Sequence, residues 1–474
     1  MDYEIGDLQT WDDRIREHVT DLGLDCFSQE FEVCDHTQML GYMAYSGMPS
    51  HYPHWSYGKA YEKLKTLYDH GMSGLPYEMV INSDPSLAYL MRDNSLCLQI
   101  LTIAHVYGHN DFFKNNLTFA RTGQQFTLGS FKAHADRIRS YMDTPGIGYE
   151  KVEFILDAAH ALSLQCQRDL AIRRLTPNEQ RDHLIEAAIP PDDPFRRIHA
   201  RPTLQEPDLR KVPLEPDGDL LLFLRDHNPF LSEWERDILG VVHAQSQYFI
   251  PQIETKIMNE GWASFIHKRI MERLDLPQAL HLEFLVRHNQ VVRPIPGSLN
   301  PYHLGLRIWE EIEHVGDDAT ERDRHGVPDG MTGRDLLFET RTCDRDVSFL
   351  RRWLTPDLMR ELDLFRYDRK DDDLVVTDVS DDDGWEAVKA LLLQNIGMAS
   401  VPVIKVVDAD YHDQRALLLR HEHDGRDLQL GNAEHTLGYA QRLWGRPVLL
   451  QTTLEGKAVT MQHDGNEFGV RSGT

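Results

Sequence analysis

Long apolar runs are missing from this chain of 474 residues. A helix that crosses a bilayer needs about 18 or more consecutive apolar residues, and no such run occurs. The residues from Met1 to Glu4 also lack the basic start and the apolar segment of a secretory signal peptide. We therefore expect a cytoplasmic protein that is not inserted into a membrane.

Cysteine is scarce, and its spacing argues against two structural classes. The chain has five cysteines, an odd number, and no C-x-x-C pair. A disulfide framework and a zinc site built from thiolates are both disfavoured by this pattern. We interpret the cysteines as small buried apolar residues. They are Cys26, Cys34, Cys97, Cys166 and Cys343.

Lysine is also sparse, while acidic residues are abundant. Lysine supplies 13 of the 50 basic residues, and 76 Asp and Glu give a net charge of −26. Such a surface repels polyanions, so we expect no nucleic-acid partner and no binding to anionic membranes. Self-repulsion of this size is screened where salt is plentiful, which favours a halophilic source. No Gly-rich phosphate loop, nucleophile elbow or kinase signature occurs.

The stretch 96–116 predicts a buried helix that carries two histidines. His105 and His109 are four residues apart on a face turned away from the apolar stripe, and such neighbours lie about 5 to 6 Å apart at Cβ, close enough to hold one ion. The spacing alone is a weak signal, because about one H-x-x-x-H pair is expected by chance in a chain with 24 His. The apolar stripe is formed by Leu96, Ile100, Ile103 and Tyr107.

A second stretch, 255–264, strengthens the prediction of a metal site. It contains Asn-Glu-Gly-Trp-Ala on a predicted helix and resembles the segment by which one large group of zinc aminopeptidases supplies a carboxylate ligand. The alternative for Glu260 is an ion pair with Lys256. His267 lies two turns, about 10 Å, further along the helix, so one ion does not easily take both. Imidazole and carboxylate suit zinc or another divalent metal. The predicted ligands are His105, His109 and Glu260.

A hydrolase built on this site needs a general base from elsewhere. Zinc proteases carry that glutamate inside H-E-x-x-H, and here the position is Val106. Asp111 points away from the ion, since two residues turn a helix by about 200°, so we expect it to cap or orient its neighbours. We predict Glu78 or His54 as the catalytic proton acceptor, because both lie outside the two metal helices in segments that resemble a known family, described below. The alternatives are a cap or an ion pair for Glu78 and a backbone hydrogen bond for His54.

The helix predicted at 149–165 offers a further set of ligand types. Glu153, Asp157 and His160 fall on one face of it. We interpret Glu153 or Asp157 as the acceptor of the free N–H of a ligand histidine. The alternative is a solvated helix face.

Several segments resemble the SpoVR family, the stage V sporulation protein R group, and together they span nearly the whole chain. The resemblance implies a link to sporulation and to cell-envelope or stress physiology. It also implies two partners encoded nearby, a serine protein kinase and a von Willebrand-like protein. The matching segments are GMPSHYPHW (47–55), YEMVINSDPSLAYLM (77–91), AHVYGHNDFFKNN (104–116), TKIMNEGWASFIH (255–267), NPYHLG (300–305), HDGRDLQL (423–430) and TLGYAQRLWGRPVLL (436–450).

Three functional hypotheses follow. The first is a metal-dependent hydrolase that acts on a peptide, an amide or a cell-wall precursor. The second is a non-catalytic, metal-stabilised partner in a signalling complex with the kinase and the von Willebrand-like protein. The third is a purely structural role for the histidines. The sequence does not define the oligomeric state.

The expected fold class is α+β. A mostly helical N-terminal part carries the zincin-like two-helix metal site, and a small C-terminal domain follows the order β-α-β-β-α-β of ferredoxin-like modules. The first forty residues are predicted to form one or two helices. Residues 77–90 are predicted to form a short strand or turn followed by a helix, which begins at Asn82 to Pro85. The predicted segments are a helical core at 1–170, a Pro-rich connection at 171–219, a helical continuation at 220–368 and the C-terminal domain at 373–474.

The charge balance predicts that salt stabilises this fold. Molar salt screens repulsion among the carboxylates, so the melting temperature should rise with salt, and the chain should expand or aggregate when salt is low. A salt titration followed by circular dichroism measures this. A melting temperature indifferent to salt would contradict the halophilic interpretation.

Overall fold

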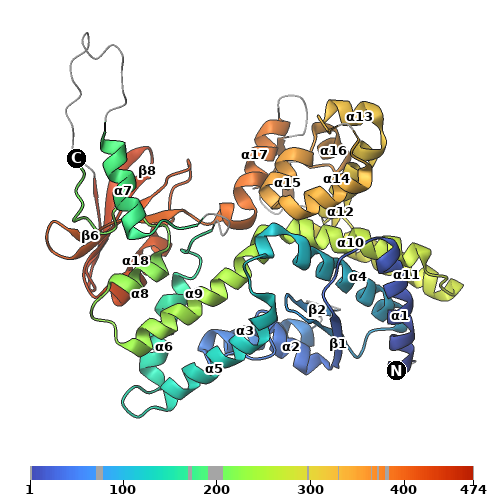
Figure 1. Ribbon diagram of the computed structural model, residues 1–474, viewed down its shortest axis with the longest axis horizontal. Helices are drawn as coiled ribbons and strands as arrows, with labels where there is room; N and C mark the ends of the chain where they lie inside the picture. The colour runs from blue at the N-terminus through green and yellow to red at the C-terminus, as the bar shows by residue number, and fades with distance from the viewer. Residues whose placement is uncertain are drawn as a thin grey trace, which may run out of the picture. The chain divides into compact units, whose positions relative to one another are not determined.

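The computed structural model (Figure 1) describes most of the chain. The described residues are 3–70, 78–168, 173–189, 206–295, 298–328, 330–364, 366–370, 373–378 and 384–472. The predicted Pro-rich connection at 171–219 falls partly outside them.

The fold is α+β, as predicted, and divides into two compact units. The first unit combines Met1–Arg139 with Tyr248–Ser400, and the second combines Ser140–Gln247 with Val401–Thr474. Each unit is therefore assembled from two separate stretches of the chain. The division into four linear segments stays a prediction.

The first unit is mainly helical. Its earlier stretch contains α1 (Ile5–Asp21), β1 (Gln29–Cys34), α2 (His36–Ala44), α3 (Trp55–Asp69), β2 (Glu78–Ile81), β3 (Ser86–Met91), α4 (Leu96–Asn115), η1 (Leu117–Phe119), η2 (Gln124–Phe126) and most of α5 (Thr127–Asp143). Its later stretch contains the end of α9 (Glu233–Glu254), then α10 (Lys256–Arg273), α11 (Gln278–Val292), α12 (Pro301–Asp317), α13 (Ala319–Arg324), α14 (Gly333–Cys343), α15 (Asp346–Trp353), α16 (Pro356–Glu361), β4 (Arg366–Lys370), β5 (Asp373–Asp378), α17 (Trp385–Asn395) and η3 (Gly397–Ser400).

A small sheet replaces a predicted helix in this unit. Its order is β1-β3-β2, with β1 parallel and β2 antiparallel to the central strand β3. The prediction of a helix at Ser86–Met91 was wrong, and Gln29–Cys34 is also a strand. Ala88, Tyr89 and Leu90 are consecutive and all buried, because a central strand is covered on both faces. A short apolar run of that kind does not distinguish strand from helix.

Helix α4 runs through the core of the first unit and packs against α10, which packs in turn against α12 (Figure 1). These helices approach closely because glycines meet at the crossings. A Cβ on Gly108 of α4 would lie 2.6 Å from Cα of Ala263. A Cβ on Gly305 of α12 would lie 2.2 Å from the carbonyl oxygen of Ile257 and 2.7 Å from Cα of Gly261. Only glycine permits backbone contact at this range.

The second unit is a mixed sheet with helices packed on it. It contains α6 (Tyr149–Ala161), α7 (Pro177–Ala188), α8 (Leu220–His227), β6 (Ile404–Tyr411), β7 (Ala416–His421), α18 (Leu430–Trp444), β8 (Val448–Leu454), β9 (Lys457–His463) and β10 (Phe468–Ser472). The strand order is β10-β9-β8-β7-β6, and β7 and β8 are parallel neighbours joined through α18. Helix α18 packs against β8 and β9, and α8 packs against β6.

The predicted ferredoxin-like order was wrong in its first strand. The strand predicted near Leu374 exists as β5, but it pairs with β4 in a separate two-stranded sheet. In the five-stranded sheet β8 lies beside β7, where β5 was expected, and β9 and β10 extend that sheet. The element order β-β-α-β at 404–454 was predicted correctly. The hairpin partner at Arg366–Lys370 is what removes β5 from the larger sheet.

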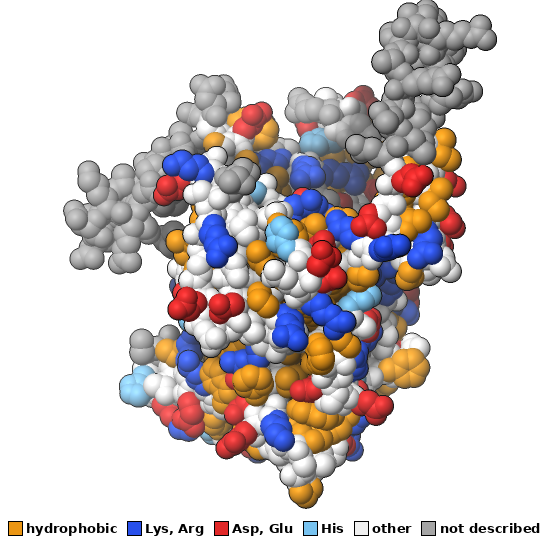
Figure 2. Space-filling view, turned by 90° about the vertical axis from the view of Figure 1, so that its left-hand side faces the viewer, with side chains coloured by type: hydrophobic (Ala, Val, Ile, Leu, Met, Phe, Trp, Pro, Cys, Tyr) orange, Lys and Arg blue, Asp and Glu red, His pale blue; other side chains and the backbone are white. Residues whose placement is uncertain are grey.

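Two structural observations relate to the predictions about membranes and about surface charge. Among the described residues, no helix is both long enough and apolar enough to cross a membrane. On the side drawn in Figure 2, acidic side chains are interspersed with Lys and Arg side chains and do not form a continuous acidic face.

The glycine contacts predict a large effect of one added methyl group. Gly305→Ala should lower the free energy of unfolding by about 1 to 3 kcal/mol, because α10 and α12 must separate to admit the Cβ. Gly58→Ala is the matched control, since Gly58 is exposed in α3 with open space around the added Cβ, and it should stabilise by about 0.5 to 1 kcal/mol. Urea unfolding of both variants measures this. Equal effects would contradict the importance of the α10–α12 crossing.

Candidate metal centre

His105 and His109 lie one turn apart on α4, inside the first unit. The helix begins at Ser95, whose side chain accepts a hydrogen bond from the Leu98 amide at 3.3 Å. It is buried on nearly every face, and His105 and His109 are 0% and 6% exposed. The predicted helix and the pairing of the two histidines on one face are confirmed.

Two carboxylates converge on these histidines from other elements. Glu78, the first residue of β2, places Oε1 3.2 Å from Nε2 of His105 and 3.7 Å from Nε2 of His109. Glu260, on α10, places Oε2 3.9 Å and 3.5 Å from the same two nitrogens. Donor atoms of Glu78, His105 and His109 all lie within 4.8 Å of one another and form a group that can hold a metal ion.

The Nδ1 nitrogen of each histidine also has a hydrogen-bonding partner. Nδ1 of His109 lies 2.8 Å from Oδ1 of Asn259, and an amide oxygen only accepts, so this nitrogen donates its hydrogen. Nε2 of neutral His109 then carries no hydrogen, and its lone pair points toward the carboxylates. Nδ1 of His105 lies 2.8 Å from Nδ1 of His267. Partners of this kind fix the tautomer and orientation of a metal-ligating histidine.

The electrostatics of the cluster favour a cation between the histidines and the carboxylates. Burial disfavours the charged form of His109, yet the hydrogen bond with Glu78 and the charges of Glu260 and Glu78 outweigh it and raise its pKa to about 9. Burial raises the pKa of Glu260, but the hydrogen bond with His105 and the charge of His109 lower it below its usual value overall. The Tyr302 hydroxyl also lowers the pKa of Glu260.

The donor set fits a divalent metal ion. Zinc bonds nitrogen and oxygen at about 2.0 to 2.2 Å, which separates neighbouring tetrahedral ligands by about 3.3 Å. The four distances between histidine and carboxylate, 3.2 to 3.9 Å, are close to this value. Oε2 of Glu78 is buried and has no hydrogen-bond partner among the described residues. A lone pair of His109 that faces carboxylates is repelled unless a proton or a metal ion lies between them.

Two sequence predictions about supporting residues met different outcomes. The free N–H of a ligand histidine was expected to reach Glu153 or Asp157. Nδ1 of His105 has His267 as its partner instead, and Nδ1 of His109 has Asn259, so that prediction was wrong. Helix α6, which carries Glu153 and Asp157, belongs to the second unit. Nδ1 of His54 accepts from the amide of Ser56 and thereby caps α3. The role of His54 as a proton acceptor stays a prediction.

Four residues of the cluster were missed as site residues from the sequence: Asn259, His267, His288 and Tyr302. Asn259 and Tyr302 lie within matching segments, so the signal was present without an assigned role. His267 was considered only as a ligand that shares the ion with Glu260, and its contact with His105 depends on the α4–α10 crossing. His288 lies on α11, and nothing in its local sequence indicates the site.

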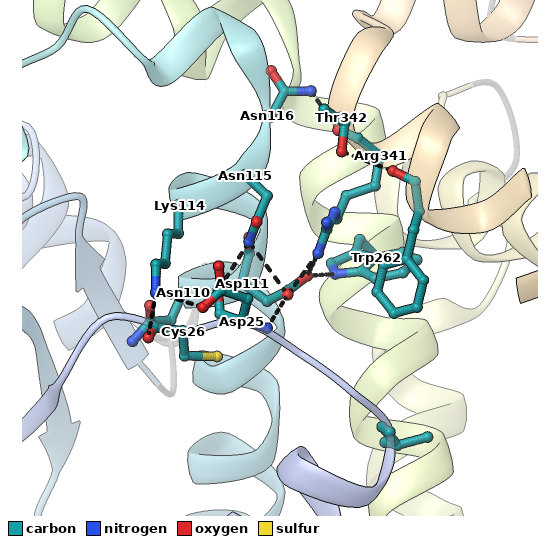
Figure 3. Close-up of polar contacts among 12 residues, drawn as sticks. Asp25, Cys26, Asn110, Asp111, Lys114, Asn115, Asn116, Trp262, Arg341 and Thr342 are labelled. Atoms are coloured by element: carbon teal, nitrogen blue, oxygen red, sulfur yellow. Dashed lines mark hydrogen bonds and ion pairs between the residues drawn. The ribbon is translucent and has the colours of Figure 1, made fainter. Parts of the chain in front are cut away.

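Asp111 forms a separate buried network beside the histidines (Figure 3). Its carboxylate accepts hydrogen bonds from the Asp25 amide at 2.8 Å, from Nε1 of Trp262 at 2.9 Å and from the Arg341 guanidinium at 2.6 and 2.7 Å. Asp111 is 0% exposed. These partners come from the N-terminal segment, α10 and α14, so the carboxylate ties three parts of the unit to α4. The prediction that Asp111 orients its neighbours is confirmed.

These observations define an α+β protein with a buried cluster of histidines and carboxylates. The family model described as "SpoVR like protein" matches residues 2–401, and "SpoVR-like C-terminal domain" matches residues 402–455. The chain therefore belongs to the SpoVR family. It is 31% identical over 470 residues to the uncharacterized protein YcgB of Escherichia coli (strain K12), covering 92% of this chain and 90% of that protein. No solved structure matches the chain.

The Asp111 network predicts a variant that loses stability and keeps its metal. Asp111→Asn leaves the Arg341 guanidinium buried without a charged partner, which should cost about 3 to 5 kcal/mol. Adding Arg341→Met removes the orphaned charge and should recover much of that loss. Chemical unfolding and metal analysis of both variants measure this. Loss of metal from a folded Asp111→Asn protein would place Asp111 in the metal site.

Proposed function

We propose that this SpoVR-family protein binds one divalent metal ion, zinc or a similar ion, and uses it to activate water for hydrolysis. The observation that carries the proposal is the group of donor atoms from Glu78, His105 and His109 that lie within 4.8 Å of one another, with Oε2 of Glu260 on α10 3.9 and 3.5 Å from the two histidine nitrogens. A bound divalent ion lowers the pKa of its water to about 7, which makes hydroxide available at neutral pH. The side chains of Glu78 and Glu260 are 10% and 19% exposed, so water has access to the cluster.

The two carboxylates have surroundings that favour different roles. Metal-ligating carboxylates are usually supported by a neighbouring polar group, and the Tyr302 hydroxyl acts on Glu260, whose pKa it lowers. Oε2 of Glu78 and Oε2 of Glu260 are both buried without a hydrogen-bond partner among the described residues, so each oxygen is available to a metal ion or to a proton. Because Tyr302 supports Glu260, we assign His105, His109 and Glu260 as ligands and Glu78 as the general base, with His54 as the other candidate for that proton.

We infer a substrate class from the physiology that the family resemblance implies. A link of SpoVR proteins to sporulation and cell-envelope physiology favours a peptide, an amide or a cell-wall precursor, handled in the cytoplasm. This zincin-like interpretation requires an open coordination position for water.

One observation favours a second candidate function. If Glu78 and Glu260 both bind the ion, four protein ligands complete a tetrahedral site, and closed sites of this kind are structural. The protein would then be a metal-stabilised partner in a complex with a serine protein kinase and a von Willebrand-like protein. The four similar distances around the histidine nitrogens are compatible with that arrangement.

Metal analysis tests the site itself. Protein purified without a His tag should hold about one equivalent of divalent metal. His109→Ala and Glu260→Ala should lose the ion and lower the melting temperature, because each removes a ligand. Glu78→Gln should keep the metal. Wild-type protein without metal, or full occupancy in both alanine variants, would overturn the proposal.

Cobalt substitution and a turnover assay separate the two candidates. The absorption spectrum of bound cobalt should change when acetohydroxamate is added, because an open position accepts this ligand. A panel of peptides, amides and peptidoglycan fragments should be hydrolysed by wild type, while Glu78→Gln and His54→Ala should be inactive with metal bound. A spectrum indifferent to hydroxamate, with no turnover, would establish the closed site instead.

A further inference from the structure

Three buried histidines form a continuous chain that starts at the metal site. Nδ1 of His105 lies 2.8 Å from Nδ1 of His267, and Nε2 of His267 lies 2.8 Å from Nδ1 of His288. The three side chains come from α4, α10 and α11, and their residues are 0%, 0% and 7% exposed. Both contacts are as short as a normal hydrogen bond, so each must have one donor and one acceptor.

The number of hydrogens on three neutral rings limits how the rings can be joined. A neutral imidazole has one N–H and one lone pair. Each ring therefore donates from one nitrogen and accepts at the other.

Only two arrangements of hydrogens satisfy both contacts. In the first, His105 donates to His267, His267 donates to His288, and Nε2 of His105 is a lone pair. In the second, every donor and acceptor is reversed, and Nε2 of His105 carries a hydrogen that points toward Oε1 of Glu78, 3.2 Å away. A mixed arrangement leaves two hydrogens or two lone pairs facing each other at 2.8 Å, which is strongly unfavourable in a buried site.

We propose that His267 and His288 are positioning residues that hold His105 in its metal-binding tautomer, and that metal binding fixes the direction of the whole chain of three rings. This inference rests on the metal site proposed above. A metal at Nε2 of His105 requires the lone pair there, so it selects the first arrangement. His105 then depends on His267 as its acceptor, as His109 depends on Asn259. His288 completes the chain because it accepts from His267.

Substitutions at His267 test the inference by metal affinity. His267→Phe fills a similar volume but offers no acceptor, and metal binding should weaken about 10- to 100-fold, as is typical when such a partner is lost. His267→Gln supplies an amide oxygen for His105 and an amide N–H for His288, so its affinity should stay close to that of wild type. His421→Phe is the matched control, since His421 is a buried histidine of the second unit that contacts Thr452. Competition with a chromophoric chelator measures all three.

A spectroscopic signature distinguishes positioning from general loss of packing. Cobalt-substituted wild type should show two solvent-exchangeable, strongly shifted proton signals from the ligand imidazoles, those of Nδ1–H of His105 and of His109. His267→Phe should lose the His105 signal and keep the His109 signal, while His267→Gln keeps both. If His267→Phe does not fold, His288→Phe is the second test variant. It should show a smaller loss of metal affinity and faster solvent exchange of the His105 proton signal.

The outcomes separate this inference from the proposed function. Wild-type protein that binds no zinc or cobalt overturns the metal site and, with it, the inference. Wild type that binds metal while His267→Phe keeps equal affinity and both proton signals overturns the inference alone. Weakened binding in His267→Phe that His267→Gln restores supports it.

Discussion

The close crossing of α4 and α10 is the constraint on which the rest of the first unit depends. Gly108 sits between the two ligand histidines in sequence and faces Ala263, so the helices approach until a single Cβ would collide with the opposite backbone. Typical helix pairs are separated by 8 to 10 Å, and small residues give the lower end of that range. The crossing brings Glu260 and His267 of α10 to opposite sides of His105. Asp111 then ties the same two helices together through Trp262.

The cluster that forms at this crossing concentrates ionisable groups in the interior, and burial alone opposes their charges. Carboxylates raise the pKa of His109 to about 9 in spite of that burial. Their field therefore selects for positive charge at one point, and a proton and a divalent metal ion compete for it. The buried salt bridge between Asp111 and Arg341 is different, because its carboxylate already accepts five hydrogen bonds from other parts of the protein.

The sequence predicted those parts of the site whose geometry is local. His105 and His109 share a helix face at fixed spacing, and the Asn-Glu-Gly run placed Glu260 by resemblance. Glu78 was recognised as a candidate only because it lay in a matching segment, and its contact with α4 depends on the pairing of β2 with β3. That pairing was not predictable, because β3 was interpreted as a helix. Five of its six residues, Leu87 to Met91, form an unbroken apolar run, and burial on both faces removes the alternation that marks an exposed strand.

The larger errors concern contacts between segments far apart in the chain. The strand β5 has the composition of a sheet strand, and nothing in its own sequence shows that Arg366–Lys370 pairs with it. The two compact units each combine stretches separated by more than 100 residues, whereas composition changes along the chain mark only linear boundaries. His288 illustrates the same limit at the level of one side chain, since its partner His267 is 21 residues away on another helix.

The elements that carry the two carboxylates also bear on whether the site is open. Glu260 lies inside a helix whose next residue, Gly261, is in backbone contact with Gly305, and Tyr302 of that same neighbouring helix lowers the pKa of its carboxyl. The backbone at Glu260 is therefore fixed against α12. Glu78 begins an edge strand that pairs on one side with β3 alone among the described strands. A metal ligand benefits from a rigid support, whereas a general base must approach water, release a proton and return. The rigid helix and the edge strand thus match the division of roles between ligand and base, because a strand end adjusts with fewer broken contacts than the centre of a close-packed helix.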